Sequence, residues 1–177
     1  MAKILAFAGS NASTSMNFKL VKYSAGIAKT HDVELLDMSN LSFPMYSEDL
    51  EKADEFPDSV IAFKKKIEGA QGILISVNEH NGYVSAYFKN LLDWLSRLDR
   101  SFLEGKKVFL MGTSPGKRGA IGSLEAIAGL LPRFGAEMSA TFSLPSFYDN
   151  FKVENGITAE SLSKTHSEAM DAFINSL

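Results

Sequence analysis

Small polar residues directly follow the first apolar stretch of the chain, and their chemistry suits a phosphate group. The stretch "KILAFA" is followed by "GSNASTSMN", in which six of the nine residues are small and polar. Serine and asparagine side chains can donate hydrogen bonds to phosphate oxygens, and backbone amides at the start of a helix add donors without any lysine or arginine. Helix capping by Ser15 and Asn17 is the alternative, because serine and asparagine are preferred there. The candidate phosphate ligands are Ser10, Asn11, Ser15, Met16 and Asn17.

Two later loops have the composition expected around a flat heteroaromatic ring. "NEHNGY" follows the apolar stretch "GILISV", and "TSPGKRG" follows "KKVFLMG". Polar groups can meet the rim of a ring, and glycines let the backbone approach a planar ligand closely. A plain surface turn at Asn81-Gly82 is the alternative for the first of these loops. In the second, Lys117 and Arg118 either meet a further phosphate-bearing nucleotide or form a solvated pair. The candidate ring ligands are Asn78, Glu79, His80, Asn81, Thr113, Ser114, Gly116 and Gly119.

The same loops lack the spacing of other nucleotide and metal sites. Five residues beyond Gly9 stands Thr14, and "GTSPGK" is followed by Arg118, so neither stretch is a Walker loop. No G-x-G-x-x-G follows the first apolar stretch, which argues against a dinucleotide site of the Rossmann type. No acidic residues follow it either, as a receiver domain would require. His80 has no partner at metal-ligand spacing, so we predict no metal.

The composition indicates one ordinary globular domain over residues 1–177. Apolar residues make up 45% of the chain and charged residues 22%, and the formal net charge of -3 argues against a nucleic-acid partner. The chain has no cysteine, which excludes disulfides and thiolate catalysis and fits a reducing, cytoplasmic location. The apolar stretches are too short to span a membrane, and "KILAFA" is too short for a signal peptide, so we expect no membrane partner.

Apolar stretches alternate with helical patterns along the chain, as in α/β proteins with a parallel sheet. Ligands of such proteins bind beyond the carboxyl ends of the strands, which is where the three polar loops fall. A proline-marked loop is expected at 41–51, and helix caps are expected from Asp58 or Ser59 and from Thr158. The expected strands are 3–9, 32–38, 72–77, 106–114 and 136–144, and the expected helices are 16–29, 58–68, 83–98, 119–132 and 158–177.

The helix expected at 83–98 is apolar around more than one stripe. One stripe packs on the sheet, which leaves Tyr87, Trp94 and Leu98 without an evident place in a monomer. A wide apolar arc indicates a second interface, often that of a homodimer. Neighbouring helices of the same chain are the alternative cover.

The three loops together resemble the NADPH-dependent FMN reductase family. Members read G-S-x-R-x-x-S-x-N after the first strand, P-E-Y-N and then a helix with K-N-x-x-D-W after the third, and S-x-G-x-x-G after the fourth. The "KNLLDW" element, at its distance from "EHN", is the most specific part of a similarity that spans about residues 3 to 145. The matching residues are Gly9-Ser10, Ser15 and Asn17, then Asn78-Glu79-His80-Asn81 with Lys89-Asn90 and Asp93-Trp94, then Ser114, Gly116 and Gly119.

The resemblance implies the flavodoxin-like fold, a three-layer α/β sandwich with a five-stranded parallel sheet in the order 2-1-3-4-5 and helices on both faces. It implies that the first loop holds the FMN phosphate, that the second lies along the isoalloxazine, and that the third approaches the pyrimidine end of the ring. It also implies a homodimer or homotetramer with the helix around Trp94 in the interface. Three residues depart from the family pattern: Ala12 replaces the usual arginine, Asn78 the proline and His80 the tyrosine.

The activity that the resemblance implies is hydride transfer from NADPH or NADH to bound FMN, and then to a quinone, flavin or azo acceptor. The cofactor carries this chemistry and the protein orients it, so no catalytic side chain is expected. Two alternatives stay open. One is an FMN-binding electron carrier of the flavodoxin type, which the modest net charge disfavours. The other is a flavin-free binding protein on the same fold, which the alanine at position 12 favours.

Overall fold

A single parallel sheet forms the middle layer of the molecule and confirms the predicted fold class. A computed structural model describes residues 1–53 and 56–177. The five strands lie in the order β2-β1-β3-β4-β5, which is the flavodoxin-like order. In the register of the sheet, Ile4 of the first strand lies opposite Val33 of the second strand on one side and opposite Gly72 of the third strand on the other. The strands are β1 (Lys3–Ala8), β2 (Asp32–Leu36), β3 (Gly72–Val77), β4 (Lys107–Thr113) and β5 (Glu137–Leu144).

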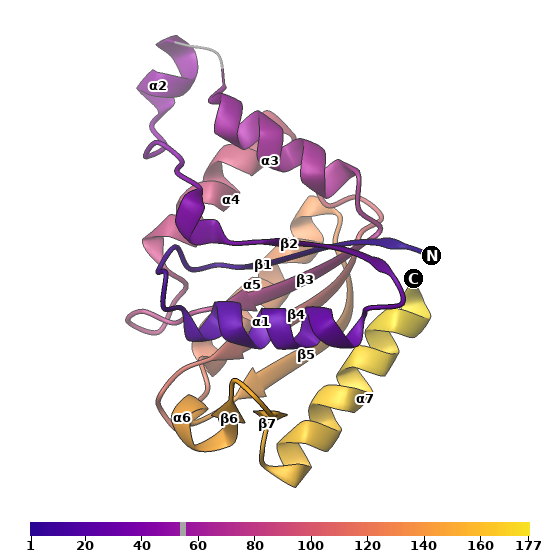
Figure 1. Ribbon diagram of the computed structural model, residues 1–177. Coiled ribbons are helices and arrows are strands. Elements are labelled where there is room, and N and C mark those ends of the chain that lie inside the picture. Colours follow the sequence, from indigo (N-terminus) through magenta and orange to yellow (C-terminus); the bar gives the residue numbers. More distant parts are fainter. Residues whose placement is uncertain (54–55) are drawn as a thin grey trace.

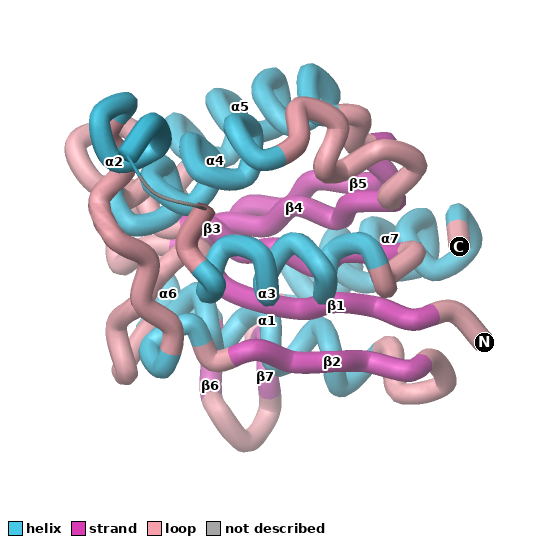
Figure 2. Tube along the Cα trace, turned by 90° about the horizontal axis from the view of Figure 1, so that it is seen from above, coloured by secondary structure: helices cyan, strands magenta, loops and turns pink. Residues whose placement is uncertain are grey.

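Helices cover both faces of the sheet, as Figures 1 and 2 show. One face carries α1 (Met16–Ile27) and α7 (Glu160–Ser176), and the other carries α3 (Asp58–Glu68), α4 (Ala86–Leu98) and α5 (Ile121–Leu130). Both chain termini lie at the end of the sheet opposite the carboxyl ends of the strands (Figure 1). The short elements are η1 (Met38–Asn40), α2 (Glu48–Ala53), η2 (Leu131–Phe134), α6 (Phe147–Asn150), β6 (Phe151–Lys152) and β7 (Gly156–Ile157).

The central strands are mostly apolar, and neither of their faces meets water. β3 is buried at every residue, and β1 and β4 are buried at every residue after the first. Phe63 and Phe88 belong to the core beneath α3 and α4, and Phe109 and Phe173 belong to the core beneath α1 and α7. Burial on both sides is what a strand between two helical layers requires. The rigid sheet fixes the positions from which the polar loops depart.

The structure corrects the predicted caps of two helices and the predicted start of a third. α3 begins after Pro57, which has no side-chain cap, so neither Asp58 nor Ser59 caps it as predicted. α7 begins after Ala159 rather than at a Thr158 cap. The helix predicted from 83 begins at Ala86, because the turn at Asn81-Gly82 comes first.

The predicted loop at 41–51 contains the start of α2, and this region covers α4. Trp94 is 1% exposed, and its indole nitrogen donates to the carbonyl oxygen of Pro44 at 2.8 Å. Asn90, one turn earlier, donates to the same carbonyl at 2.9 Å. The rings of Tyr46 and Phe56 meet the Trp94 indole edge-on. The apolar arc of α4 is therefore covered by the chain itself, which corrects the inference that Trp94 is surplus to a monomer.

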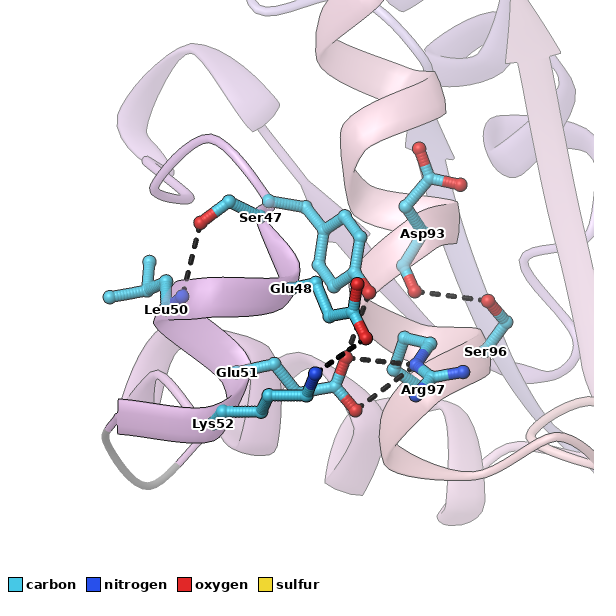
Figure 3. Close-up of polar contacts among 9 residues, drawn as sticks. Ser47, Glu48, Leu50, Glu51, Lys52, Asp93, Ser96 and Arg97 are labelled. Atoms are coloured by element: carbon cyan, nitrogen blue, oxygen red, sulfur yellow. Dashed lines mark hydrogen bonds and ion pairs between the residues drawn. The ribbon is translucent and has the colours of Figure 1, made fainter.

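A polar cluster fastens α2 to α4 at the edge of this cover (Figure 3). Arg97 donates from Nε to both carboxylate oxygens of Glu51, at 3.0 and 2.9 Å. Tyr46 donates its hydroxyl to Glu51 at 2.8 Å. The hydrogen bond from Arg97 holds the pKa of the Glu51 carboxyl below its usual value. The pair lies at the surface, where such contacts contribute little to stability. The two hydrogen bonds that the Pro44 carbonyl accepts from the buried residues Asn90 and Trp94 are the stronger anchor.

No helix in the described part of the chain has the length and apolar character needed to cross a membrane.

Candidate functional site

Three loops leave the sheet at the carboxyl ends of neighbouring strands, and hydrogen bonds join the first loop to the segment of the second. They are the β1 loop (residues 9–15), the β3 loop (78–85) and the β4 loop (114–120), and they lie at the edge opposite the termini (Figure 1). The Gly9 amide donates to the carbonyl of Ser76 at 2.9 Å, and the Ser85 hydroxyl donates to the carbonyl of Gly9 at 2.8 Å. The loops that the sequence brought together as one site are therefore neighbours in the structure.

Asn17 ties the start of α1 to the two central strands. Its amide oxygen accepts from the Ser76 hydroxyl at 2.8 Å and from the Thr113 amide at 3.0 Å. Its amide nitrogen donates to the carbonyl of Thr113 at 3.1 Å. Both residues are buried, and the Thr113 hydroxyl donates to the carbonyl of Leu144. Asn17 and Thr113, predicted as ligands, thus lie beneath the site and hold its floor together.

Ser15 caps α1 and leaves the first turn of the helix open. Its hydroxyl oxygen accepts from the Phe18 amide at 3.1 Å, which confirms the capping interpretation for this residue. The hydroxyl proton stays available, because this contact uses only the oxygen. Within the described residues, the amides of Met16 and Asn17 have no acceptor. The first turn carries no acidic residue, so it presents donors and the positive end of the helix dipole.

The β3 loop is a tight turn that leaves one polar atom unpaired. His80 and Tyr83 form a two-way backbone pair around Asn81 and Gly82, whose φ values are 53° and 78°. The Asn-Gly turn, which the sequence left open as the alternative for this loop, is present. Among the residues the structure describes, one buried side-chain oxygen lacks a hydrogen-bond partner, namely Oδ1 of Asn78. Such orphans are rare in native proteins and call for a donor from elsewhere.

The β4 loop is fixed by a fourth loop that sequence reasoning missed. The amides of Ser146 and Phe147, directly after β5, donate to the carbonyls of Gly116 and Ser114 at 2.9 and 3.1 Å. Gly119 packs against the end of β5 and has a φ of 57°. A side chain at 119 would meet the backbone of Pro145 at 2.8 Å. The sole sequence signal for this fourth loop was the Pro145-Ser146 pair that follows the last predicted strand.

Strained backbone gathers at this edge of the sheet. Of the residues described, three that are not glycine have left-handed φ values: Asn81 at 53°, Ala120 at 63° and Ser146 at 46°. One belongs to each of the β3 loop, the β4 loop and the loop after β5. Strain of this kind costs free energy and concentrates at functional sites.

Glu79 lies in the β3 loop but makes its contact with α5. Its Oε2 atom accepts a hydrogen bond from the backbone amide of Ser123 at 3.1 Å. Ser123 is the third residue of α5, and α5 has no side-chain cap of its own. The carboxylate therefore accepts a hydrogen bond from the first turn of α5, the helix that follows the β4 loop.

The remaining predicted residues lie around the edge at differing depth. Asn11, His80, Asn81 and Gly116 are exposed, and Ser10, Met16 and Ser114 are partly buried. Lys117 and Arg118 are exposed at the tip of the β4 loop. No group of three metal-ligating side chains occurs among residues 1–53 and 56–177.

A separate groove lies away from these loops. It has a volume of 640 Å³ and runs between the outer face of α1 and the hairpin of β6 and β7. Its walls are mostly apolar, and two lysines line it. None of the predicted site residues does so. The lining residues are Phe18, Lys19, Lys22, Tyr23, Gly26, Ile27, Phe151 and Val153.

The groups at the loop edge fit a ring that carries a phosphate. The open amides of Met16 and Asn17 and the hydroxyl of Ser15 are donors at a helix start, where phosphate binds. The unpaired Asn78 oxygen is an acceptor in the neighbouring loop, as a ring N–H requires. The glycine-rich β4 loop completes the edge. The fold and this arrangement of loops define a protein of the flavodoxin-like class, whose ligands bind at the carboxyl ends of the strands.

Comparison with known proteins narrows the class to a family. Residues 2–148 match the family of NADPH-dependent FMN reductases, and the chain belongs to that family. A 2-hydroxy-1,4-benzoquinone reductase of a Burkholderia species is 35% identical over 66% of this chain and 63% of its own length. An uncharacterized protein of Mycoplasma pneumoniae is 28% identical over 84% of this chain and 90% of its own.

A solved structure is similar over nearly the whole chain. The flavoenzyme NAD(P)H:(acceptor) oxidoreductase FerB of Paracoccus denitrificans superposes with a TM-score of 0.79 at 27% identity, covering 99% of this chain and 96% of that one. The family match and these relatives confirm the predicted class of enzyme, an oxidoreductase.

Proposed function

We propose that the protein is an FMN-dependent NAD(P)H oxidoreductase that passes hydride from the nicotinamide to bound FMN and on to a small acceptor, such as a quinone, a flavin or an azo compound. The observation that carries the proposal is the start of α1, where Ser15 caps the helix and the amides of Met16 and Asn17 stay open. A helix start in this state is an anion site. Membership of the family supports FMN as the molecule whose phosphate binds there.

In this proposal each loop has one task. The β1 loop binds the phosphate through backbone amides and the hydroxyls of Ser10 and Ser15, without the arginine that Ala12 replaces. The β3 loop offers the Asn78 oxygen to the ring, and the β4 loop lets the ring approach through Gly116. FMN supplies the hydride chemistry when it is bound. The protein supplies no acid, base or nucleophile, and its part is to bind and orient.

The proposal is tested by loading the purified protein with FMN and then with riboflavin. We expect one FMN per chain, with the flavin absorbance bands retained after gel filtration. Riboflavin should bind at least about 100-fold more weakly, because it lacks the phosphate that several donors would hold. If FMN and riboflavin bind equally, the phosphate site at α1 is wrong. If neither binds, the flavin-free alternative is correct.

A second measurement separates the enzyme from the electron carrier. NADPH and NADH oxidation by the FMN-loaded protein is followed with a quinone, free flavin and an azo dye as acceptors. Turnover with any of them supports the oxidoreductase. Tight FMN binding without turnover with either nucleotide would favour the carrier. The ratio of kcat/KM values for the two nucleotides decides which reductant is preferred.

The homodimer or homotetramer stays a proposal with a changed interface. Trp94 is covered by Pro44 and Tyr46 of its own chain, so an interface on α4 would have to use other side chains. Light scattering on the purified protein measures the number of copies. The cytoplasmic location also stays a prediction, which cell fractionation checks.

A further inference from the structure

The contact between Glu79 and α5 joins two loops of the site that are otherwise separate. The Oε2 atom of Glu79 accepts from the Ser123 amide at 3.1 Å, across 44 residues of sequence. Ala120, at the cap position of α5, offers no side-chain hydrogen bond and has a φ of 63°. A carboxylate is the favoured partner of a helix start, because it meets both the open amides and the positive end of the dipole. The β3 loop therefore provides the cap that the β4 loop lacks.

The fit at this contact is tight enough to define the distance between the loops. A Cβ atom placed on Gly122, the second residue of α5, would lie 3.0 Å from Glu79 Oε2 and 3.0 Å from the carbonyl oxygen of Gly82. Both distances are shorter than ordinary contacts. The first turn of α5 thus lies close to the β3 loop at its carboxylate and at its backbone, and a side chain at position 122 would press on both.

We propose that Glu79 is a positioning residue, which sets the spacing between the β3 loop and the β4 loop for the flavin ring and does not bind the flavin itself. This inference rests on the proposed function. The carboxylate is engaged by α5, so its partner is the protein rather than the ligand. A ring held between the two loops would feel any change in their spacing.

Two substitutions of Glu79 separate positioning from direct binding. Glu79→Ala removes the acceptor, and Glu79→Gln keeps an oxygen that can accept from Ser123 while removing the charge. We expect Glu79→Ala to weaken FMN binding about tenfold and Glu79→Gln to restore it to within about twofold of the parent. Riboflavin should lose the same factor as FMN, because the spacing acts on the ring. In the apo protein, amide hydrogen exchange at Ser123 should quicken in Glu79→Ala only.

A pair of glycine substitutions in α5 provides a matched control. Gly122→Ala places a methyl group against Glu79 and Gly82, whereas Gly129→Ala, in the same helix, meets nothing within 4 Å. Both changes favour the helix equally. We expect Gly122→Ala to weaken binding of both flavins about tenfold, and Gly129→Ala to leave it unchanged.

Each outcome decides the inference. Binding that is unchanged in Glu79→Ala overturns it, and so does an equal loss in Glu79→Ala and Glu79→Gln, which would mark a direct contact of the charge. A loss for FMN alone overturns it too, because only the phosphate would be affected. If the parent protein binds no FMN, the proposed function fails first and the inference fails with it. Equal losses for both flavins, with rescue by glutamine, support it.

Discussion

The helices α1 and α5 begin at the same edge of the sheet, but their first turns are satisfied in opposite ways. At α1 the cap is Ser15, a neutral residue of the same loop, and the amides of Met16 and Asn17 stay open in the described structure. At α5 the cap is Glu79, a charged residue of another loop. An open start attracts an anion, whereas a start that already holds a carboxylate does not. The difference favours the start of α1 over the start of α5 as the place where a phosphate binds.

The contrast between the two helix starts is tested most directly by giving α1 a carboxylate cap, which α5 already has. Aspartate is as good a cap as serine, so Ser15→Asp should preserve the helix and place a negative charge at the phosphate site. We expect FMN to bind about 1,000-fold more weakly, because like charges at close range repel by several kcal/mol. Riboflavin, which has no phosphate, serves as the control and should bind as it does to the parent. A parallel loss of both flavins would point to a damaged loop instead.

The middle of α1 contacts a buried imidazole, that of His166 in α7. Nε2 of His166 lies 2.8 Å from the Ser24 hydroxyl, and burial lowers the pKa of His166 to about 4. Unfolding returns this pKa to about 6.5, so between those values the unfolded chain binds a proton that the folded chain does not. The stability from this group is full above pH 6.5 and falls as the pH drops toward 4, by up to about 3 kcal/mol.

Urea unfolding between pH 4 and pH 7.5 measures this dependence. The control is His166→Phe, which keeps an aromatic ring beside Phe109 and Phe142 and cannot titrate. The difference in unfolding free energy between parent and variant should vary with pH in the window from 4 to 6.5. A constant difference would show that His166 is not responsible.

The hydrogen bonds of Asn17 beneath the start of α1 allow a third test, with a smaller expected effect. Asn17→Ala leaves the Ser76 hydroxyl and the Thr113 amide buried without their partner. We expect a loss of about 2 kcal/mol in unfolding free energy, because unsatisfied buried groups are costly. Asn11→Ala, in the exposed part of the same loop, should change stability by less than about 0.5 kcal/mol. Equal effects of the two substitutions would contradict the role of Asn17 as a link.

The smallest effect is expected at a third helix start, that of α4. Its cap Ser85 accepts from the Phe88 amide and donates to the carbonyl of Gly9. Ser85→Ala should cost about 1 kcal/mol of unfolding free energy. Ser47→Ala removes a similar contact to the Leu50 amide on the exposed helix α2, where we expect a smaller loss. Denaturant unfolding of the two variants ranks them, and the reverse order would mean that burial at Ser85 adds nothing.

The sequence predicted the sheet and its functional edge because those features depend on local patterns. All five strands were placed to within two residues of their observed ends, since buried parallel strands are continuous apolar stretches. Capping by Ser15 was one of two interpretations that its residue type left open, and the resemblance supplied the strand order. The three polar loops were brought together by the rule that parallel strands end at one edge.

Contacts between distant segments could not be predicted in this way. Nothing near Glu79 in the sequence indicates that its carboxylate faces Ser123. The residue type of Asn17 suits a ligand as well as a buried link between strands. Its hydrogen bonds to Ser76 and Thr113 are visible only in the structure. Cover of Trp94 by the same chain was left open as an alternative, but the covering segment could not be named, because Pro44 lies 50 residues away.

The hydrogen bonds of Asn90 and Trp94 both end on a main-chain oxygen, that of Pro44. Every amino acid carries such an oxygen, so the recognition does not depend on which side chain stands at position 44. Substitutions at position 44 that keep the backbone path are therefore compatible with docking, whereas a substitution of Asn90 or Trp94 must bring another N–H to the same place. The docking of this segment thus constrains the side chains of α4 more than the side chain at position 44.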